Sequence, residues 1–152
     1  MSKKYRATQT EYDEPKYTIS TAAKLVGTTD HTLRVYEREG LIILKKKPSG
    51  HRLYSKSDID RLKGIREMIV AQKLSIAGIK AMLALIPCWK IINCSTNDRN
   101  NCDAYQKDYW PCWSYKHENN TCTKFDCRLC EVYKTHGKFN EVRKLIKSMT
   151  SD

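Results

Sequence analysis

The chain has 152 residues and a formal net charge of +11, a length that suits one ordinary domain or two small ones. No stretch approaches the roughly 20 apolar residues of a membrane-spanning helix, and the opening residues MSKKYRATQTEYDEPK lack the apolar core of a secretory signal. We therefore expect a cytoplasmic protein with no membrane partner, whose thiols stay reduced. Residues 1–87 hold 17 basic and 9 acidic side chains, and this surplus favours a polyanionic partner such as nucleic acid.

The first elements of the chain predict a polar arm followed by two short helices. Residues 1–16 are polar and predict a flexible N-terminal arm. A short helix is expected over 20–26 and a second one over DHTLRVYERE, with Gly27 as the break between them and Gly40 as the stop. Helix, short turn and helix in this order are typical of a helix-turn-helix.

The next segment, LIILKKKPSGHRLYS, predicts two short strands around a turn at 48–50, with lysines at the tip. Ser55 and Asp58 have the spacing of a capping box, which predicts the start of a third helix. A fourth helix is expected after Ser75, and Pro87 marks its boundary. The residues of the third helix that recur at helical spacing, and that we expect in the core, are Ile59, Leu62, Ile65 and Ile69.

The segment from residue 17 to 86 closely resembles the DNA-binding domain of the MerR family of bacterial transcription regulators. The resemblance depends on the motifs TLRVYEREGLI, SGHRLYS and DIDRLKGI, while the ending LSIAGIKAML is similar to the HspR branch, whose members repress heat-shock operons. It implies a winged helix-turn-helix domain over 17–87 that binds a double-stranded DNA operator as a homodimer. RNA polymerase is a further candidate partner.

The resemblance also implies which residues contact DNA. Arg34 is expected to hold a phosphate or read a guanine, and Arg52 to clamp a phosphate from the wing. Tyr54 has a second interpretation, as a core residue that anchors the wing. Family members usually continue into a long helix that forms the dimer. Here Pro87 and a cysteine-rich segment follow instead. Dimerisation could therefore use that segment, the last helix or the DNA itself. The implied DNA-binding residues are Thr32, Arg34, Tyr36, Lys46, His51, Arg52 and Tyr54.

Residues 88–135 have a different composition. They contain all seven cysteines, all three tryptophans and few aliphatic side chains after Ile92. A segment of this kind cannot build an ordinary core, so a metal, a cluster or disulfides must hold it together. Residues 136–152 predict a C-terminal amphipathic helix.

An internal repeat runs through the cysteine-rich segment. Cys94, Cys102 and Tyr105 recur 28 positions later as Cys122, Cys130 and Tyr133. Each set follows a Cys-Trp pair, at 88–89 and 112–113, and Cys127 is the unpaired extra cysteine. The repeat predicts two similar half-sites.

The segment resembles a small module called two-CW, after its paired Cys-Trp dipeptides, whose biochemistry the resemblance does not define. Thiolates favour soft or borderline metals. We expect an iron–sulfur cluster in preference to zinc, because only Cys127 and Cys130 show a zinc-like C-x-x-C spacing, and a thiol–disulfide switch is the third alternative. His117 and His136 are further candidates to complete a site. The expected metal ligands are Cys88, Cys94, Cys102, Cys112, Cys122, Cys127 and Cys130.

Together these patterns predict a mainly α protein: a winged helix-turn-helix with a small β wing, a small cysteine-rich domain that depends on a metal or cluster, and a C-terminal helix. No nucleophile–base pair, phosphate loop or paired-carboxylate motif indicates an enzyme. The predicted function is a MerR-type transcription regulator whose cysteine-rich domain senses a signal through its metal or cluster. The alternatives are a regulator in which structural zinc serves dimerisation, and a thiol–disulfide redox protein.

Overall fold

A computed structural model describes residues 11–107, 109–135 and 139–151. These residues fall into two compact units, one ending at Ile76 and the other beginning at Ala77. The division lies at the start of the fourth helix, eleven residues before the Pro87 boundary that the sequence indicates. No helix in the described part of the chain is long and apolar enough to cross a membrane.

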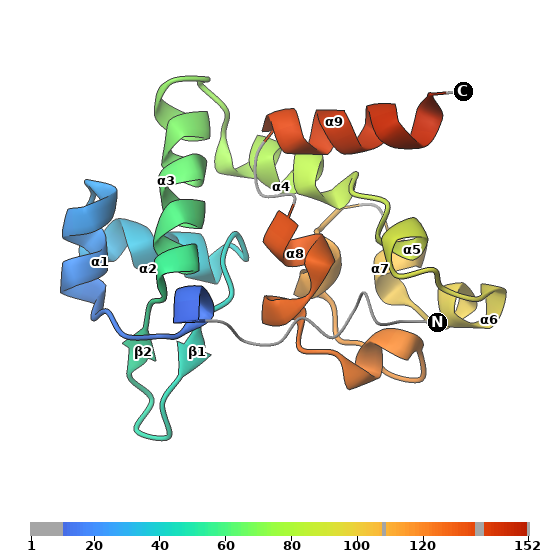
Figure 1. Ribbon diagram of the computed structural model, residues 1–152, viewed down its shortest axis with the longest axis horizontal. Helices are drawn as coiled ribbons and strands as arrows, with labels where there is room; N and C mark the ends of the chain where they lie inside the picture. Colours follow the sequence, from blue (N-terminus) through green and yellow to red (C-terminus); the bar gives the residue numbers. More distant parts are fainter. Residues whose placement is uncertain (1–10, 108, 136–138, 152) are drawn as a thin grey trace. The chain divides into compact units, whose positions relative to one another are not determined.

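The first unit contains short helices and one hairpin (Figure 1). Its elements are η2 (Glu11–Asp13), α1 (Ile19–Val26), α2 (Asp30–Arg38), β1 (Lys45–Lys46), β2 (Arg52–Leu53) and α3 (Lys56–Val70).

Side-chain caps and one glycine set the ends of α1 and α2. Thr18 caps α1 by accepting the N–H of Thr21, and Thr29 caps α2 by accepting the N–H of Thr32. Gly27 ends α1 in the left-handed conformation, with a φ of 83° that only glycine adopts at little cost. The helix-turn-helix predicted from the sequence is confirmed.

The core of the first unit forms where α1 and α2 meet and where α1 packs on α3. Ile59, Leu62 and Ile65 are buried as expected, whereas Ile69 is only half-buried and Met68 fills the core in its place. Helices this short are marginal in isolation, so their stability comes from this packing. The remaining buried apolar residues of the unit are Ala22, Ala23, Val26, Leu33, Tyr36, Leu41, Ile42 and Tyr54.

The wing is an antiparallel hairpin in which Lys45 pairs with Leu53. Its tip is closed by the Lys47 N–H, which donates to the His51 carbonyl at 3.0 Å, and by Gly50 at a φ of 83°. The prediction that all three lysines lie at the tip is wrong for residues 45–46, which form β1.

Residues 11–17 contact the body of the first unit. Tyr17 and Tyr54 form an antiparallel bridge at the base of the wing, and the Tyr12 hydroxyl donates to Asp60 of α3 at 2.6 Å. The described end of the predicted flexible arm is thus docked, because strand pairing and a side-chain hydrogen bond hold it. Residues 1–10 of that arm lie outside the described residues.

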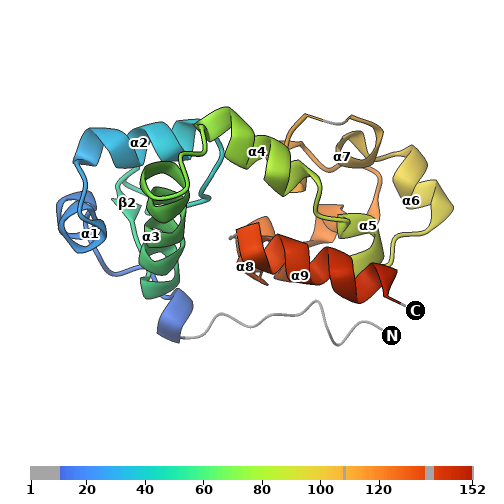
Figure 2. The ribbon, with the colours of Figure 1, turned by 90° about the horizontal axis from the view of Figure 1, so that it is seen from above.

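The second unit begins with α4 (Ile76–Ala84) and continues through short helical segments (Figure 2), and the cysteines lie in these segments or next to them. These segments are α5 (Cys88–Ile91), α6 (Thr96–Asn100), α7 (Asp103–Gln106), η3 (Cys112–Ser114), η4 (Thr121–Lys124), η5 (Cys127–Leu129) and α8 (Glu131–Thr135). The C-terminal helix α9 (Phe139–Thr150) follows as predicted and buries Val142, while Ile146 and Met149 remain exposed.

Two aromatic pairs show that the sequence repeat is also a structural repeat. Trp89 meets Tyr105 edge to face at 5.4 Å and 83°, and Trp113 meets Tyr133 in the same way at 5.2 Å and 84°. These pairs add to the packing of buried aliphatic side chains such as Ile92 and Val132. We call residues 87–106 the first half-site of the module and residues 111–134 the second.

The capping box of α3 generates a stability prediction. The Ser55 hydroxyl accepts the Asp58 N–H at 3.0 Å, and the Asp58 carboxylate accepts the Ser55 N–H at 2.8 Å. Replacing Ser55 with Ala should lower the free energy of unfolding by about 1–2 kcal/mol, because a buried cap is lost. Urea unfolding followed by far-ultraviolet circular dichroism measures this change. The control Ser49→Ala lies in the exposed wing turn and should change the free energy by less than about 0.5 kcal/mol; equal effects of the two substitutions would contradict the role of the box.

Candidate functional site

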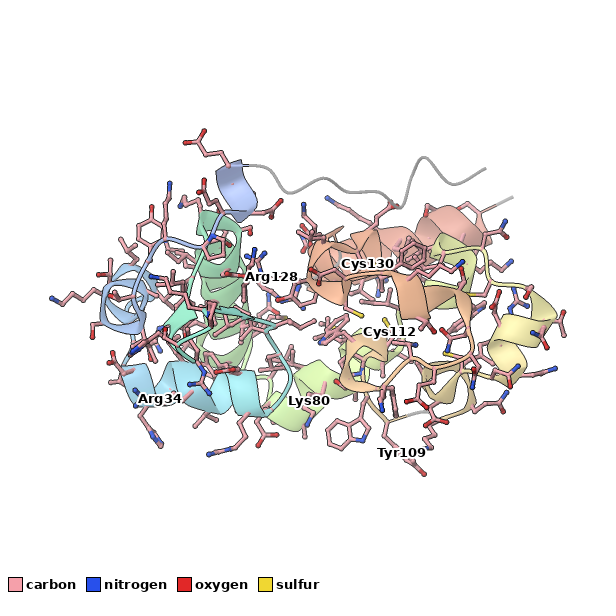
Figure 3. All side chains as sticks on the ribbon, turned by 90° about the horizontal axis from the view of Figure 1, so that it is seen from below. Arg34, Lys80, Tyr109, Cys112, Arg128 and Cys130 are labelled. Carbon is pink, nitrogen blue, oxygen red and sulfur yellow. The ribbon has the colours of Figure 1, made fainter. Side chains whose placement is uncertain are left out.

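Helix α2 carries the exposed residues of the candidate DNA surface. Arg34 is exposed and projects outward from the helix (Figure 3), and it has no ion-pair partner within the described part of the chain. His31 and Arg38 are also exposed. Thr32 is half-buried, and its hydroxyl accepts a hydrogen bond from Thr29 at 3.0 Å. Arg34 and Arg38 are therefore the basic side chains of α2 that are exposed to meet a polyanion.

An ion pair ties the wing to helix α2. The Arg52 Nε donates to the Glu37 carboxylate, and the two side chains are 38% and 17% exposed. A guanidinium has five N–H donors, so this contact with Nε leaves the terminal nitrogens for a phosphate. Sequence reasoning missed Glu37, because its partner lies 15 positions away and no local pattern links the two.

Two of the expected DNA-contacting residues are buried. Tyr36 is 4% exposed and hydrogen-bonded to Arg66, and burial raises its pKa. Tyr54 is fully buried at the base of the wing, where burial raises its pKa to about 12. The burial of Tyr54 agrees with its interpretation as a core residue that anchors the wing. A contact of the Tyr36 or Tyr54 ring with DNA stays a prediction, and burial of the two rings does not favour it. In the wing His51 is exposed, and the Lys46 side chain lies outside the described residues.

The second candidate site is a cavity in the cysteine-rich unit. All seven cysteines line it, together with Trp89, Tyr105, Trp113 and Tyr133 of the aromatic pairs. The cavity has a volume of about 30 Å³ and apolar walls. A space of that size exceeds the ~10–15 Å³ that one water needs. The sequence predicts two half-sites, and the thiols of both line one cavity. Figure 3 shows Cys112 and Cys130, two cysteines of the second half-site that line it.

Cys88 and Cys112 contact each other at equivalent positions of the two half-sites. Their thiols share a hydrogen bond, which lowers the pKa of Cys88 and raises the pKa of Cys112. The two Cys-Trp pairs therefore meet inside the cavity.

Burial raises the pKa of most of the other thiols. The pKa of Cys94 and the pKa of Cys127 each rise to about 11, and the pKa values of Cys122 and Cys130 are also raised, in every case chiefly by burial. Metal ligation needs thiolates, so an ion that enters the cavity must displace protons, and its affinity must fall as the pH falls. Among the described residues no group of three or more His, Cys, Asp or Glu side chains is already arranged around one point for an ion. Ligation therefore requires side-chain rotation.

His117 connects the two half-sites. Its Nε2 lies 2.9 Å from the Cys112 carbonyl oxygen, and its Nδ1 lies 3.9 Å from the Cys102 Sγ. A carbonyl only accepts hydrogen bonds, so Nε2 carries the proton, and in the neutral ring the lone pair of Nδ1 faces Cys102. The second histidine candidate, His136, lies outside the described residues.

Comparison with known proteins concerns the N-terminal half of the chain. Residues 17–86 match the family model described as MerR HTH family regulatory protein. The matched stretch is just under half of the 152 residues. A protein of Streptomyces coelicolor that bears the name heat shock protein HspR is 37% identical over 73 residues, which are 48% of this chain and 48% of that protein. The chain thus matches about half the length of this curated relative. Residues 17–86 are thus similar to the MerR HTH family, and their fold is a winged helix-turn-helix.

The aromatic pairs that wall the cavity generate a second stability prediction. Tyr133 is 4% exposed, so Tyr133→Leu removes a buried edge-to-face contact with Trp113. It should destabilise the module by about 0.5–1.5 kcal/mol more than Tyr133→Phe, which keeps the ring. Thermal unfolding followed by tryptophan fluorescence provides the measurement. Because Tyr105 is 38% exposed, Tyr105→Leu should cost less than Tyr133→Leu; equal stability of the Leu and Phe variants at position 133 would refute the packing argument.

Proposed function

We propose that this protein is a DNA-binding transcription regulator that contacts a duplex operator through α2 and the wing. The observation that supports this most directly is the ion pair between Arg52 and Glu37, because it joins the wing to a helix that exposes Arg34. Recognition helices of helix-turn-helix proteins enter the major groove, while neighbouring basic residues hold phosphates. The likeness of residues 17–86 to the MerR family model supports the same function.

The dimeric state is part of the proposal. A near-palindromic operator contains the same DNA sequence twice and requires two recognition helices at a set spacing. One copy of this domain cannot supply both helices. We therefore propose a homodimer on DNA.

The cysteine-rich module is proposed to bind a metal centre and to act as the sensor of the regulator. Seven thiols and one imidazole around an apolar cavity form a donor set that suits zinc or an iron–sulfur cluster. A change in that centre, by loss, exchange or oxidation, is the proposed signal.

Helix α4 offers a route by which the module reaches the DNA-binding domain. The family match extends to residue 86 and so includes α4, yet this helix belongs to the same compact unit as the cysteines. The Lys80 ammonium on α4 stacks on the Trp110 ring at 3.4 Å, and the Cys88 N–H donates to the Ile86 carbonyl at 2.8 Å. A rearrangement at Cys88 would act on the last helix of the DNA-binding domain without an intervening linker.

Replacing Arg34 with Ala tests the DNA surface. On a duplex selected from a random pool with the parent protein, Arg34→Ala should weaken binding by about 1–3 kcal/mol if the guanidinium reads a base. If it holds a phosphate, binding should weaken on all duplexes and the salt dependence should decrease by about one ion. Fluorescence anisotropy at several salt concentrations distinguishes the two cases.

The matched control is Lys73→Ala, which removes the same charge from an exposed residue of the turn that follows α3. The C-terminal end of α3 lies away from the wing (Figure 1). This variant should bind like the parent protein. Equal binding by the Arg34 variant, the Lys73 variant and the parent would exclude α2 as the DNA-contacting helix.

Removal of the metal tests the sensor module. Protein purified without oxygen and then treated with a chelator should lose the near-ultraviolet dichroism of Trp89, Trp110 and Trp113, because ligand binding supplies folding energy in a segment with so few aliphatic residues. Hydrogen exchange should show that α3 stays protected, since its core contains no cysteine. Retention of the full tryptophan signal after complete metal removal would exclude a folding role for the metal.

A further inference from the structure

The wing is too small to hold its own position. Strands β1 and β2 contain two residues each, and an isolated two-stranded hairpin is marginally stable at best in water. Arg52 lies on β2, so the place that its guanidinium reaches depends on whatever fixes the hairpin. The ion pair with Glu37 joins two side chains and leaves the backbone of the wing without support. Another part of the chain must therefore hold the strands.

Residues 11–17 supply that support, and we call them the strap. The Tyr54 N–H, directly after β2, donates to the Tyr17 carbonyl at 2.8 Å. The Tyr54 carbonyl in turn accepts the N–H groups of Tyr17 at 2.9 Å and of Lys16 at 3.0 Å. The strap thus adds a third extended segment at the base of the hairpin, and three paired strands are more stable than two.

The other end of the strap is anchored on α3. The segment η2 lies against this helix (Figures 1 and 2). The Tyr12 hydroxyl donates to the Asp60 carboxylate at 2.6 Å, and Asp13 beside it is only 2% exposed. Burial, and then the hydrogen bond with Asp60, raise the pKa of Tyr12 to about 12. The hydroxyl therefore keeps its proton at neutral pH and remains a donor.

The two anchors of the strap lie on either side of the step from β2 to α3. Only Tyr54 and Ser55 separate the strand from the helix, and Asp60 lies in the second turn of α3. Between its anchors the strap contains Pro15, whose ring fixes φ and makes this stretch stiff. A stiff segment that is attached at both ends limits how far the wing can swing relative to α3.

We propose that the strap positions the wing for DNA, and that Tyr12 is a positioning residue for Arg52. This inference rests on the proposed DNA contact of the wing and adds a residue that touches neither Arg52 nor DNA. Tyr12 precedes residue 17, where the match to the MerR family model begins, so the likeness to that family assigns it no role.

A purely structural role of Tyr12 predicts a different behaviour. In that case loss of the side chain would lower the stability of the domain, while Arg52 in the folded protein would contact DNA as before. A positioning role instead makes the contributions of Tyr12 and Arg52 to DNA affinity depend on each other. A double-mutant cycle measures that dependence directly.

The test measures DNA binding by the full chain, with a duplex that the parent protein selects from a random pool. Tyr12→Ala should weaken binding by about 3–10-fold, the range that one hydrogen bond contributes. It should also lower the salt dependence by up to about one ion, because a displaced guanidinium neutralises its phosphate less well. In the Arg52→Ala background, Tyr12→Ala should change the affinity by less than about 2-fold. Fluorescence anisotropy at several salt concentrations gives all four affinities.

Two phenylalanine variants form a matched pair that guards against misfolding. Tyr12→Phe keeps the ring and loses only the hydroxyl that is bonded to Asp60. It should weaken DNA binding by about 2–5-fold. Tyr17→Phe removes a hydroxyl from the same strap that has no hydrogen-bond partner in the described part of the chain, and it should bind DNA like the parent protein.

Hydrogen exchange without DNA gives a second readout. The N–H groups of Tyr17 and Tyr54 pair with each other's carbonyls, so both should exchange at least about 3-fold faster in Tyr12→Phe. The Leu33 N–H donates to the Thr29 carbonyl in α2 and should keep its exchange rate. Unchanged exchange at positions 17 and 54 would show that Tyr12 does not hold the wing.

The outcomes separate this inference from the function on which it rests. Parent-like DNA affinity of both Tyr12 variants, or equal weakening by Tyr12→Ala with and without Arg52, overturns the positioning role and leaves DNA binding intact. Parent-like affinity of Arg52→Ala overturns the DNA contact of the wing, and with it the role of Tyr12. If the parent protein selects no duplex, the proposed function fails, and hydrogen exchange still decides whether the strap holds the wing.

Discussion

The first unit depends on one constraint: none of its helices is long enough to be stable without its neighbours. Helix α2 has nine residues, and it forms because Leu33 and Tyr36 are buried in a core that α3 helps to build. The same packing determines which face of α2 reaches solvent. Leu33 and Tyr36 lie on the face of α2 that packs in the core, and Arg34 lies on the exposed face. The candidate DNA surface is therefore a by-product of core formation, and the Glu37–Arg52 ion pair then attaches the wing to it.

The cysteine-rich module meets the same requirement for stability by different means. It adds two edge-to-face aromatic pairs to buried aliphatic side chains such as Ile92 and Val132, and it collects seven thiols in one cavity. Burial holds the pKa values of most of these thiols above the ordinary range, so without a ligand the cavity is lined by neutral groups that stabilise it little. A bound metal would convert these groups into ligands and contribute folding energy. Metal loss would then be a large structural event, as a sensor requires.

Helix α4 is the candidate connection between the two proposed functions. This helix lies within the stretch that matches the MerR family model and packs with the cysteine-rich module, where Lys80 stacks on Trp110. Two sites can be coupled only through an element whose arrangement both of them influence. In the proposed function, α4 and the Pro87–Cys88 step that follows it are the candidates for such an element, because Cys88 is also a candidate ligand.

Local patterns in the sequence determined the helices, the hairpin, the Ser55 capping box and the repeat of the cysteine module, because each depends on residues close together in the chain. Periodicity also predicted Ile59 and Leu62 in the core. The tertiary structure decided what depends on distant residues: the burial of Tyr36, the pairing of Arg52 with Glu37 and the approach of His117 to Cys102. Spacing showed that two half-sites exist, but only folding could bring both sets of thiols to one cavity, because the path of the chain between them decides which groups meet.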